Sequence, residues 1–216
     1  IVTGDTKVVN RGHGDGVYIN TSGIGFIPQG RALGGDKCQP GDKILVSGTL
    51  GDHGITIMSC RAQLSFKDDL RSDAAPLNHL IEDVLKAAPN TRCFRDPTRG
   101  GLASTANELA EQSGVDMVID EDAVPVKDMV RGACDMLGYD VLQVANEGKM
   151  VCVVPPDEAD AACEAMRANK YGIDAAIIGE VRLSNAARGS RVTVRTAFGS
   201  ERILDMLVGE QLPRIC

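Results

Sequence analysis

The chain ends in Pro213-Arg214-Ile215-Cys216, so its last residue carries a thiol. Thiolates are strong nucleophiles, and the neighbouring guanidinium of Arg214 favours the thiolate while the terminal carboxylate opposes it. A cysteine on a tail can reach a site that a core cysteine cannot. The alternative is a frayed end that happens to finish on cysteine, since disorder concentrates at termini.

A second chemical signal is RDPTRGG at residues 95–101, which leads into an expected helix. The first backbone N–H groups of a helix and the positive end of its dipole attract anions such as phosphate. Asp96 in this loop could hold a magnesium ion. The same residues also make an ordinary helix start, and the sequence leaves both interpretations open.

Three shorter motifs combine acidic and basic side chains at the ends of expected strands. GDTK at residues 4–7 ends in Lys7, and NEGK at residues 146–149 places Glu147 before a buried strand. A glutamate there could act as a general base, although a simple turn and a solvated lysine explain these motifs equally. His53, in GDHG, is either a proton carrier or a polar loop residue.

Composition limits the classes of function. The 216 residues carry a formal net charge of −7, with no basic run, which argues against affinity for nucleic acid or an anionic membrane surface. Aromatic residues make up 3% of a chain that is 43% hydrophobic, so the core must be aliphatic. No apolar run approaches the length of a membrane span.

The cysteines argue against a zinc site and for a reducing compartment. They never form a C-x-x-C pair, and the three histidines are not at ligand spacing to them. An odd number of cysteines without a leader fits a cytoplasmic protein in which most thiols pack as small hydrophobes. The seven are Cys38, Cys60, Cys93, Cys134, Cys152, Cys163 and Cys216.

The chemical residues require strands and helices to position them. Alternating apolar residues predict two strands within residues 1–28, and these strands need pairing partners that the chain does not obviously provide. From residue 39 onward, strand and helix patterns alternate, which predicts an α/β fold of the α+β sandwich type. We expect three regions: residues 1–38, residues 39–181, and residues 182–216 with terminal strands and a flexible tail.

The expected elements from residue 39 follow apolar periodicity. We predict a helix through Met58 and Leu64, and a helix near Pro76 with Ser72 and Asp73 as possible caps. We also predict a helix that starts after Gly101 and a helix capped by Asp157. The remaining predictions are strands at 43–48, 115–120, 149–154 and 175–181, a helix around Met129–Leu137, and two short strands within 191–207.

Taken together, the motifs resemble one family. GDTKV, SGTLGDHG, DPTRGG, ANEGK and a terminal PRIC, in this order, resemble the HypE family of hydrogenase maturation proteins. That family belongs to the ATP-binding superfamily of aminoimidazole ribonucleotide synthetase and selenophosphate synthetase. The resemblance covers essentially the whole chain, and PRIC is its most specific element. It implies a PurM-like C-terminal domain at 39–181 after a remnant of the ATP-binding domain at 1–38.

The resemblance implies an ATP-dependent carbamoyl dehydratase of [NiFe]-hydrogenase maturation. A partner, HypF, would place a carbamoyl group on Cys216. ATP-driven dehydration would give a thiocyanate, and the nitrile would pass to iron through the HypC–HypD complex. The implied catalytic residues are Cys216, Glu147 and Lys7, and the implied Mg²⁺ ligands are Asp5 and Asp96. The implied ATP-binding residues are Asp5, Thr6, Lys7, Asp96, Thr98, Arg99, Gly100, Gly101 and Asn146.

One departure from the family limits this expectation. The family's glycine-rich and acidic motifs upstream of GDTKV are absent, and the chain starts at Ile1. We therefore expect an N-terminally truncated fragment that is inactive alone and binds ATP weakly or not at all. The longer protein is expected to form a homodimer.

Two rivals stay open. One is another ATP-dependent enzyme of the superfamily, similar to selenophosphate synthetase or aminoimidazole ribonucleotide synthetase. The other is a non-catalytic carrier that presents Cys216 to partner proteins.

Overall fold

The computed structural model describes residues 2–13, 16–62, 70–185 and 187–206. The chain divides into two compact units, Ile1–Arg31 and Ala32–Cys216. No helix in the described ranges is both long enough and apolar enough to cross a membrane.

The first unit has neither strand nor helix in its described part. A turn closes with the Asn10 carbonyl accepting from His13 N at 3.0 Å. The two strands predicted within residues 1–28 are therefore wrong. The alternating apolar residues are present, but a strand needs a hydrogen-bonded neighbour, and no described segment of this unit provides one. The apolar side chains are left exposed, including Val2, Val8, Val17, Tyr18, Ile19, Ile24, Phe26 and Ile27.

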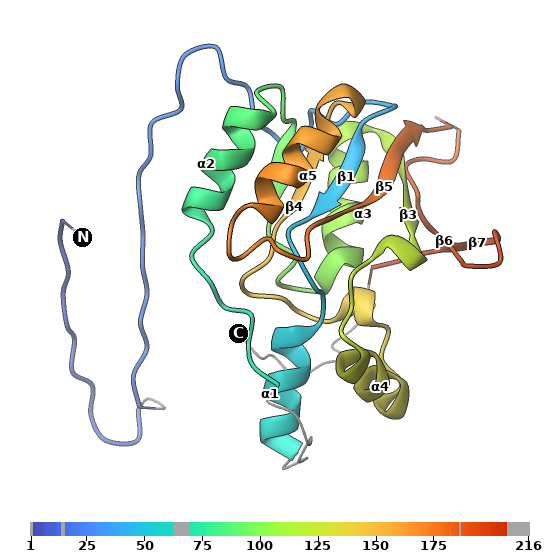
Figure 1. The fold of residues 1–216 in the computed structure, drawn as a ribbon. Helices are drawn as coiled ribbons and strands as arrows, with labels where there is room; N and C mark the ends of the chain where they lie inside the picture. The colour runs from blue at the N-terminus through green and yellow to red at the C-terminus, as the bar shows by residue number, and fades with distance from the viewer. Residues whose placement is uncertain (1, 14–15, 63–69, 186, 207–216) are drawn as a thin grey trace. The chain divides into compact units, whose positions relative to one another are not determined.

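The second unit is built on a mixed sheet (Figure 1). Among the described residues the sheet has seven strands, in the order β2-β4-β1-β5-β3-β6-β7. Every neighbouring pair is antiparallel except β3 and β6, which run parallel. The strands are β1 (Lys43–Val46), β2 (Cys93–Arg95), β3 (Val115–Asp120), β4 (Val151–Val154), β5 (Ala176–Leu183), β6 (Val192–Arg195) and β7 (Glu201–Ile203).

Helices cover both faces of this sheet (Figure 1). The helices are α1 (Asp52–Ala62), α2 (Asn78–Ala87), α3 (Gly101–Ser113), α4 (Asp128–Leu137) and α5 (Ala159–Arg167). Because side chains alternate along a strand, Ile44 and Val46 pack with α3, whereas Leu45 packs with α2 and α5. Burial on both faces explains why β1 and β4 read as continuous apolar runs.

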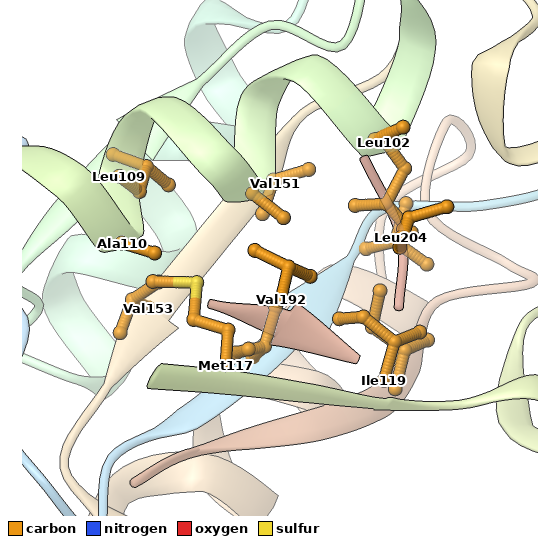
Figure 2. Close-up of a cluster of buried hydrophobic side chains, with 14 of the residues drawn as sticks. Leu102, Leu109, Ala110, Met117, Ile119, Val151, Val153, Val192 and Leu204 are labelled. Atoms are coloured by element: carbon orange, nitrogen blue, oxygen red, sulfur yellow. The ribbon is translucent and has the colours of Figure 1, made fainter. Parts of the chain in front are cut away.

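The larger core lies between α3 and the sheet (Figure 2). Leu102, Leu109 and Ala110 of α3 face apolar residues of β3, β4 and β6, and Leu204 closes one end of the cluster. A smaller apolar cluster joins α1 to α4 through Ile55, Val130, Ala133, Cys134 and Val144. These two cores hold α1 and α3 in place. The candidate site is built from the N-terminal ends of these two helices.

Most helices and strands predicted beyond residue 39 are confirmed, with three differences. β2 was not predicted. Helix α2 begins at Asn78 and has no side-chain cap, so the prediction of Ser72 and Asp73 as caps is wrong. Asp157 lies inside the 3-10 turn Pro156–Glu158 and does not cap α5. Leu64, the expected end of α1, lies outside the described residues. Strand β5 continues to Leu183, and β6 and β7 complete the same sheet.

The described cysteines are mostly core residues. Cys38, Cys93, Cys134, Cys152 and Cys163 are buried, and Cys60 is exposed. Burial raises the pKa of the Cys134 thiol to about 11 and raises the pKa of Cys152. Buried thiols of this kind are poor nucleophiles near neutral pH, so Cys60 is the described thiol most open to reagents.

Candidate functional site

The side chain of Asn146 connects three loops at the centre of the site. It is fully buried. Its Oδ1 accepts from Gly51 N at 2.8 Å, and its Nδ2 donates to Val144 O at 2.9 Å and Pro97 O at 3.2 Å. Asn146 N also donates to Pro97 O. The amide is thus used within the protein, and it holds together the loops before α1, before α3 and before β4.

The loop before α3 depends on two adjacent glycines. Gly100 and Gly101 have φ of 67° and 60°, a left-handed conformation that favours glycine. A Cβ on Gly101 would lie 2.6 Å from both the Leu142 and the Val144 carbonyl oxygens. No side chain caps α3 at its N-cap, Gly100. Gly101 is therefore required for the close approach of this helix start to residues 142–144.

Replacing Gly101 with Ala is expected to destabilise the protein by about 3 kcal/mol, from left-handed strain plus steric overlap. Gly114→Ala is the matched control, because Gly114 has a φ of 65° and a Cβ added there would meet nothing within 4 Å. It should cost about 1 kcal/mol. The measurement is urea unfolding of both variants. Equal losses would contradict the close approach to residues 142–144.

The polar residues of this loop face outward. The side chain of Asp96 is 59% exposed, and its Oδ1 accepts from Arg95 at 2.6 Å. Arg95 also binds Glu108 at 2.9 Å, and this hydrogen bond raises the pKa of Arg95. Arg99 is exposed and forms no ion pair with a described residue. The loop therefore offers an accessible carboxylate at Asp96 and an accessible cation at Arg99.

Glu147 lies next to Asp73, from the segment before α2. The Asp73 carboxylate accepts from Glu147 N at 3.0 Å and from Gly148 N at 3.3 Å, both through Oδ1. Gly148 sits against the Asp73 backbone, where a Cβ would lie 1.7 Å from the Asp73 carbonyl oxygen. The glycine of NEGK is therefore needed because another backbone occupies its side-chain position.

The same segment is attached to the first turn of α1. His53 Nδ1 and Ser72 Oγ are hydrogen-bonded at 2.8 Å. Next to it, Asp52 Oδ2 accepts from Thr49 Oγ1 at 2.6 Å and from Lys127 Nζ at 2.9 Å. Both Asp52 and His53 are buried.

Buried polar atoms without a partner concentrate in these segments. In the part of the chain that the structure describes, four such side-chain atoms occur: Asp52 Oδ1, His53 Nε2, Asp73 Oδ2 and Glu147 Oε1. All four belong to the start of α1, the segment before α2 or the loop before β4, and hydrogen bonds join these segments. Native proteins satisfy nearly all buried polar groups, so this concentration makes the three segments the candidate functional site.

The structure brings together part of the predicted site. A hydrogen bond from Asn146 to Pro97 O connects Asn146 to the loop that carries Asp96, Thr98, Arg99, Gly100 and Gly101. Glu147 is the next residue after Asn146. Asp5, Thr6 and Lys7 belong to the other unit, where Asp5 Oδ1 accepts from Thr6 N at 2.8 Å. Cys216 lies outside the described residues. Within those residues, no cluster of three or more His, Cys, Asp or Glu side chains could hold a metal ion.

The sequence of the chain is similar to that of known proteins. Residues 39–189 match the model of the AIR synthase related protein, C-terminal domain. The chain belongs to the AIR synthase related family. Carbamoyl dehydratase HypE from Azotobacter vinelandii is 53% identical over all 216 residues, and the chain spans 62% of that relative's length. The resemblance to HypE proteins is thereby confirmed.

Solved structures of HypE proteins are also similar to this chain. A HypE crystal structure in complex with ATP has a TM-score of 0.79 and 45% identity, and the match covers 85% of this chain and 55% of that one. A HypE–HypF complex has a TM-score of 0.76 and 44% identity, covering 81% of this chain and 56% of that one. The mixed α/β fold predicted from sequence is confirmed.

Proposed function

We propose that this chain is the C-terminal part of an ATP-dependent carbamoyl dehydratase that acts on its own C-terminal cysteine in [NiFe]-hydrogenase maturation. The observation that carries this proposal is the Glu147 carboxylate. Its Oε1 is buried without a partner among the described residues, in a loop whose backbone is fixed by Asp73. The name carbamoyl dehydratase, borne by a relative 53% identical over the whole chain, supports the same reaction.

The reaction converts the S-carbamoyl group on Cys216, RS–C(=O)–NH₂, into the thiocyanate RS–C≡N. Phosphoryl transfer from ATP supplies a leaving group for the amide oxygen, since an oxygen atom by itself leaves poorly. The overall balance is RS–C(=O)–NH₂ + ATP → RS–C≡N + ADP + phosphate + H⁺. Both nitrogen protons must leave: Glu147 accepts one of them as general base and releases it as H⁺, and the other departs with the phosphate as HPO₄²⁻.

The remaining residues of the proposal handle phosphate. Lys7 and Arg99 would neutralise phosphate charge, and the start of α3 at Gly100 and Gly101 would offer backbone N–H groups. Thr6, Thr98 and Asn146 complete the ATP-binding set, Asn146 by holding the Asp96 loop in place. The fit to ATP is supported by a HypE structure that contains it.

Asp5 and Asp96 are the proposed ligands of Mg²⁺. Asp5 and Asp96 are both exposed, and oxygen ligands suit Mg²⁺. A bound Mg²⁺ would neutralise developing phosphate charge. Asp5 and Asp96 belong to different units, so the proposal specifies the ligands and no distance between them.

The proposed partners are HypF, which would carbamoylate Cys216, and the HypC–HypD complex, which would receive the nitrile. A HypE–HypF complex among the similar structures supports the first. We also propose a cytoplasmic location and a homodimer for the longer protein. The chain spans 62% of its relative, so activity is expected of the longer protein rather than of these residues alone.

The test is intact-mass analysis of the full-length protein after incubation with HypF, carbamoyl phosphate and ATP. A Cys60→Ser background removes the exposed described thiol as a competing site. We expect a carbamoyl adduct on Cys216 that loses one water when ATP is added. An adduct that never loses water would favour the carrier, and an unmodified Cys216 would favour a kinase similar to selenophosphate synthetase.

A further inference from the structure

Dehydration of a carbamoyl group imposes a geometric demand that Glu147 alone does not meet. The nitrogen of RS–C(=O)–NH₂ carries two N–H bonds that lie in one plane. A single carboxylate oxygen can accept one of them, while the other N–H would be left without an acceptor in a buried site. Leaving a donor unpaired in such a site costs about 1–3 kcal/mol. A second acceptor is therefore expected beside the base.

Asp73 is placed to be that acceptor. Its Oδ1 lies 3.0 Å from Glu147 N and 3.3 Å from Gly148 N. The Asp73 carboxylate is therefore hydrogen-bonded to the backbone of the residue that carries the proposed base. The backbones of the two segments are also in close contact, since a Cβ on Gly148 would overlap the Asp73 carbonyl oxygen. The residue before Asp73, Ser72, is hydrogen-bonded to His53 and so connects the same segment to the start of α1.

The two carboxylates share an unusual property. Asp73 Oδ2 and Glu147 Oε1 are both buried, and neither has a hydrogen-bond partner among the described residues. A buried carboxylate oxygen without a donor is costly, and it becomes favourable only when a donor is supplied. The two unpaired acceptors equal in number the two N–H donors of a primary amide.

We propose that Asp73 Oδ2 binds the nitrogen of the carbamoyl group. Oδ1 holds the Glu147–Gly148 backbone, and Oδ2 accepts one substrate N–H, which directs the other N–H to Glu147. The ligand class is a primary amide or thiocarbamate. This assignment rests on the proposed function and adds a substrate-binding residue to it.

Substitution by Asn separates the two roles of Asp73. In Asp73→Asn the amide oxygen must face the two backbone N–H donors, so the loop stays held. The NH₂ group then replaces Oδ2 and meets the substrate N–H donor to donor. Asp73→Ala removes both functions. If Asp73 only held the loop, Asn would restore activity that Ala loses.

The experiment uses the full-length protein in the Cys60→Ser background, carbamoylated on Cys216. Loss of water after ATP addition is followed by intact mass under single-turnover conditions. We expect both variants to slow this step by about 100-fold, in line with loss of one preorganised hydrogen bond. Amide hydrogen exchange at Glu147 and Gly148 should stay as in the parent for Asp73→Asn and rise at least about tenfold for Asp73→Ala.

Three results would overturn the assignment. A rate for Asp73→Asn within about threefold of the parent would leave Asp73 a purely structural role. Slow dehydration together with fast amide exchange in Asp73→Asn would assign the loss to the loop. Failure of the parent protein itself to lose water would reject the proposed function, and with it the substrate that this assignment requires.

Discussion

Replacing Glu147 with Gln is expected to slow dehydration of the carbamoyl group by about 1000-fold or more while leaving ATP binding unchanged. Gln has nearly the same shape, and the Glu147 backbone keeps its hydrogen bond to Asp73. Gln cannot accept the nitrogen proton, and removal of a general base typically costs 10²–10⁴ in rate. The measurement is the single-turnover loss of water from carbamoylated Cys216, with ATP affinity measured by calorimetry.

The control for this variant is Glu111→Gln. Glu111 lies on α3 and is exposed, so the same chemical change occurs away from the site. Its rate should equal that of the parent. Nitrile formation by Glu147→Gln at the parent rate would remove Glu147 as the base.

Replacing Asn146 with Ala should give the largest loss of stability among single polar substitutions in the site, about 3 kcal/mol. The change leaves Gly51 N–H and Val144 C=O buried without their partner and removes one of two bonds to Pro97 O. An orphaned buried group costs about 1–3 kcal/mol. Urea unfolding of the chain measures the loss.

Asn90→Ala is the matched control. The Asn90 amide donates to Glu158 at 2.6 Å, but the residue is exposed, so water replaces the lost partner. The expected loss is below about 1 kcal/mol. If both variants lose the same free energy of unfolding, the hydrogen bonds of Asn146 to the three loops do not stabilise the protein.

The second unit could be predicted from apolar periodicity because its helices and strands have strong patterns. Leu80 and Val84 lie on the buried face of α2, and β1 is a continuous apolar run between two helical layers. β2 could not be found in this way, since three residues are too few to show a period. The two strands expected within residues 1–28 failed for another reason: alternation describes a strand's surface and says nothing about its pairing partner.

The sequence reveals the motifs of the candidate site but not the contacts that connect them. RDPTRGG and NEGK are joined through Asn146, a long-range contact that neither motif reveals by itself. Sequence alone makes Ser72 and Asp73 possible helix caps, because both residue types are common at the N-cap of a helix. Pro76 argues against this assignment, because the residue before proline favours extended backbone and separates Asp73 from the helix. The extended segment then reaches the Glu147 loop.

The position of β5 has a consequence for how the protein is made. It lies at the centre of the sheet between β1 and β3, yet it comes from residues 176–183, late in the described chain. During synthesis, β1 and β3 are therefore complete before the strand that pairs with both of them. Their apolar residues stay exposed in that interval and can cause aggregation. Contacts of this sequence separation also slow folding. A nascent chain stopped before residue 176 would contain the Glu147 loop but lack the central strand of the sheet that supports it.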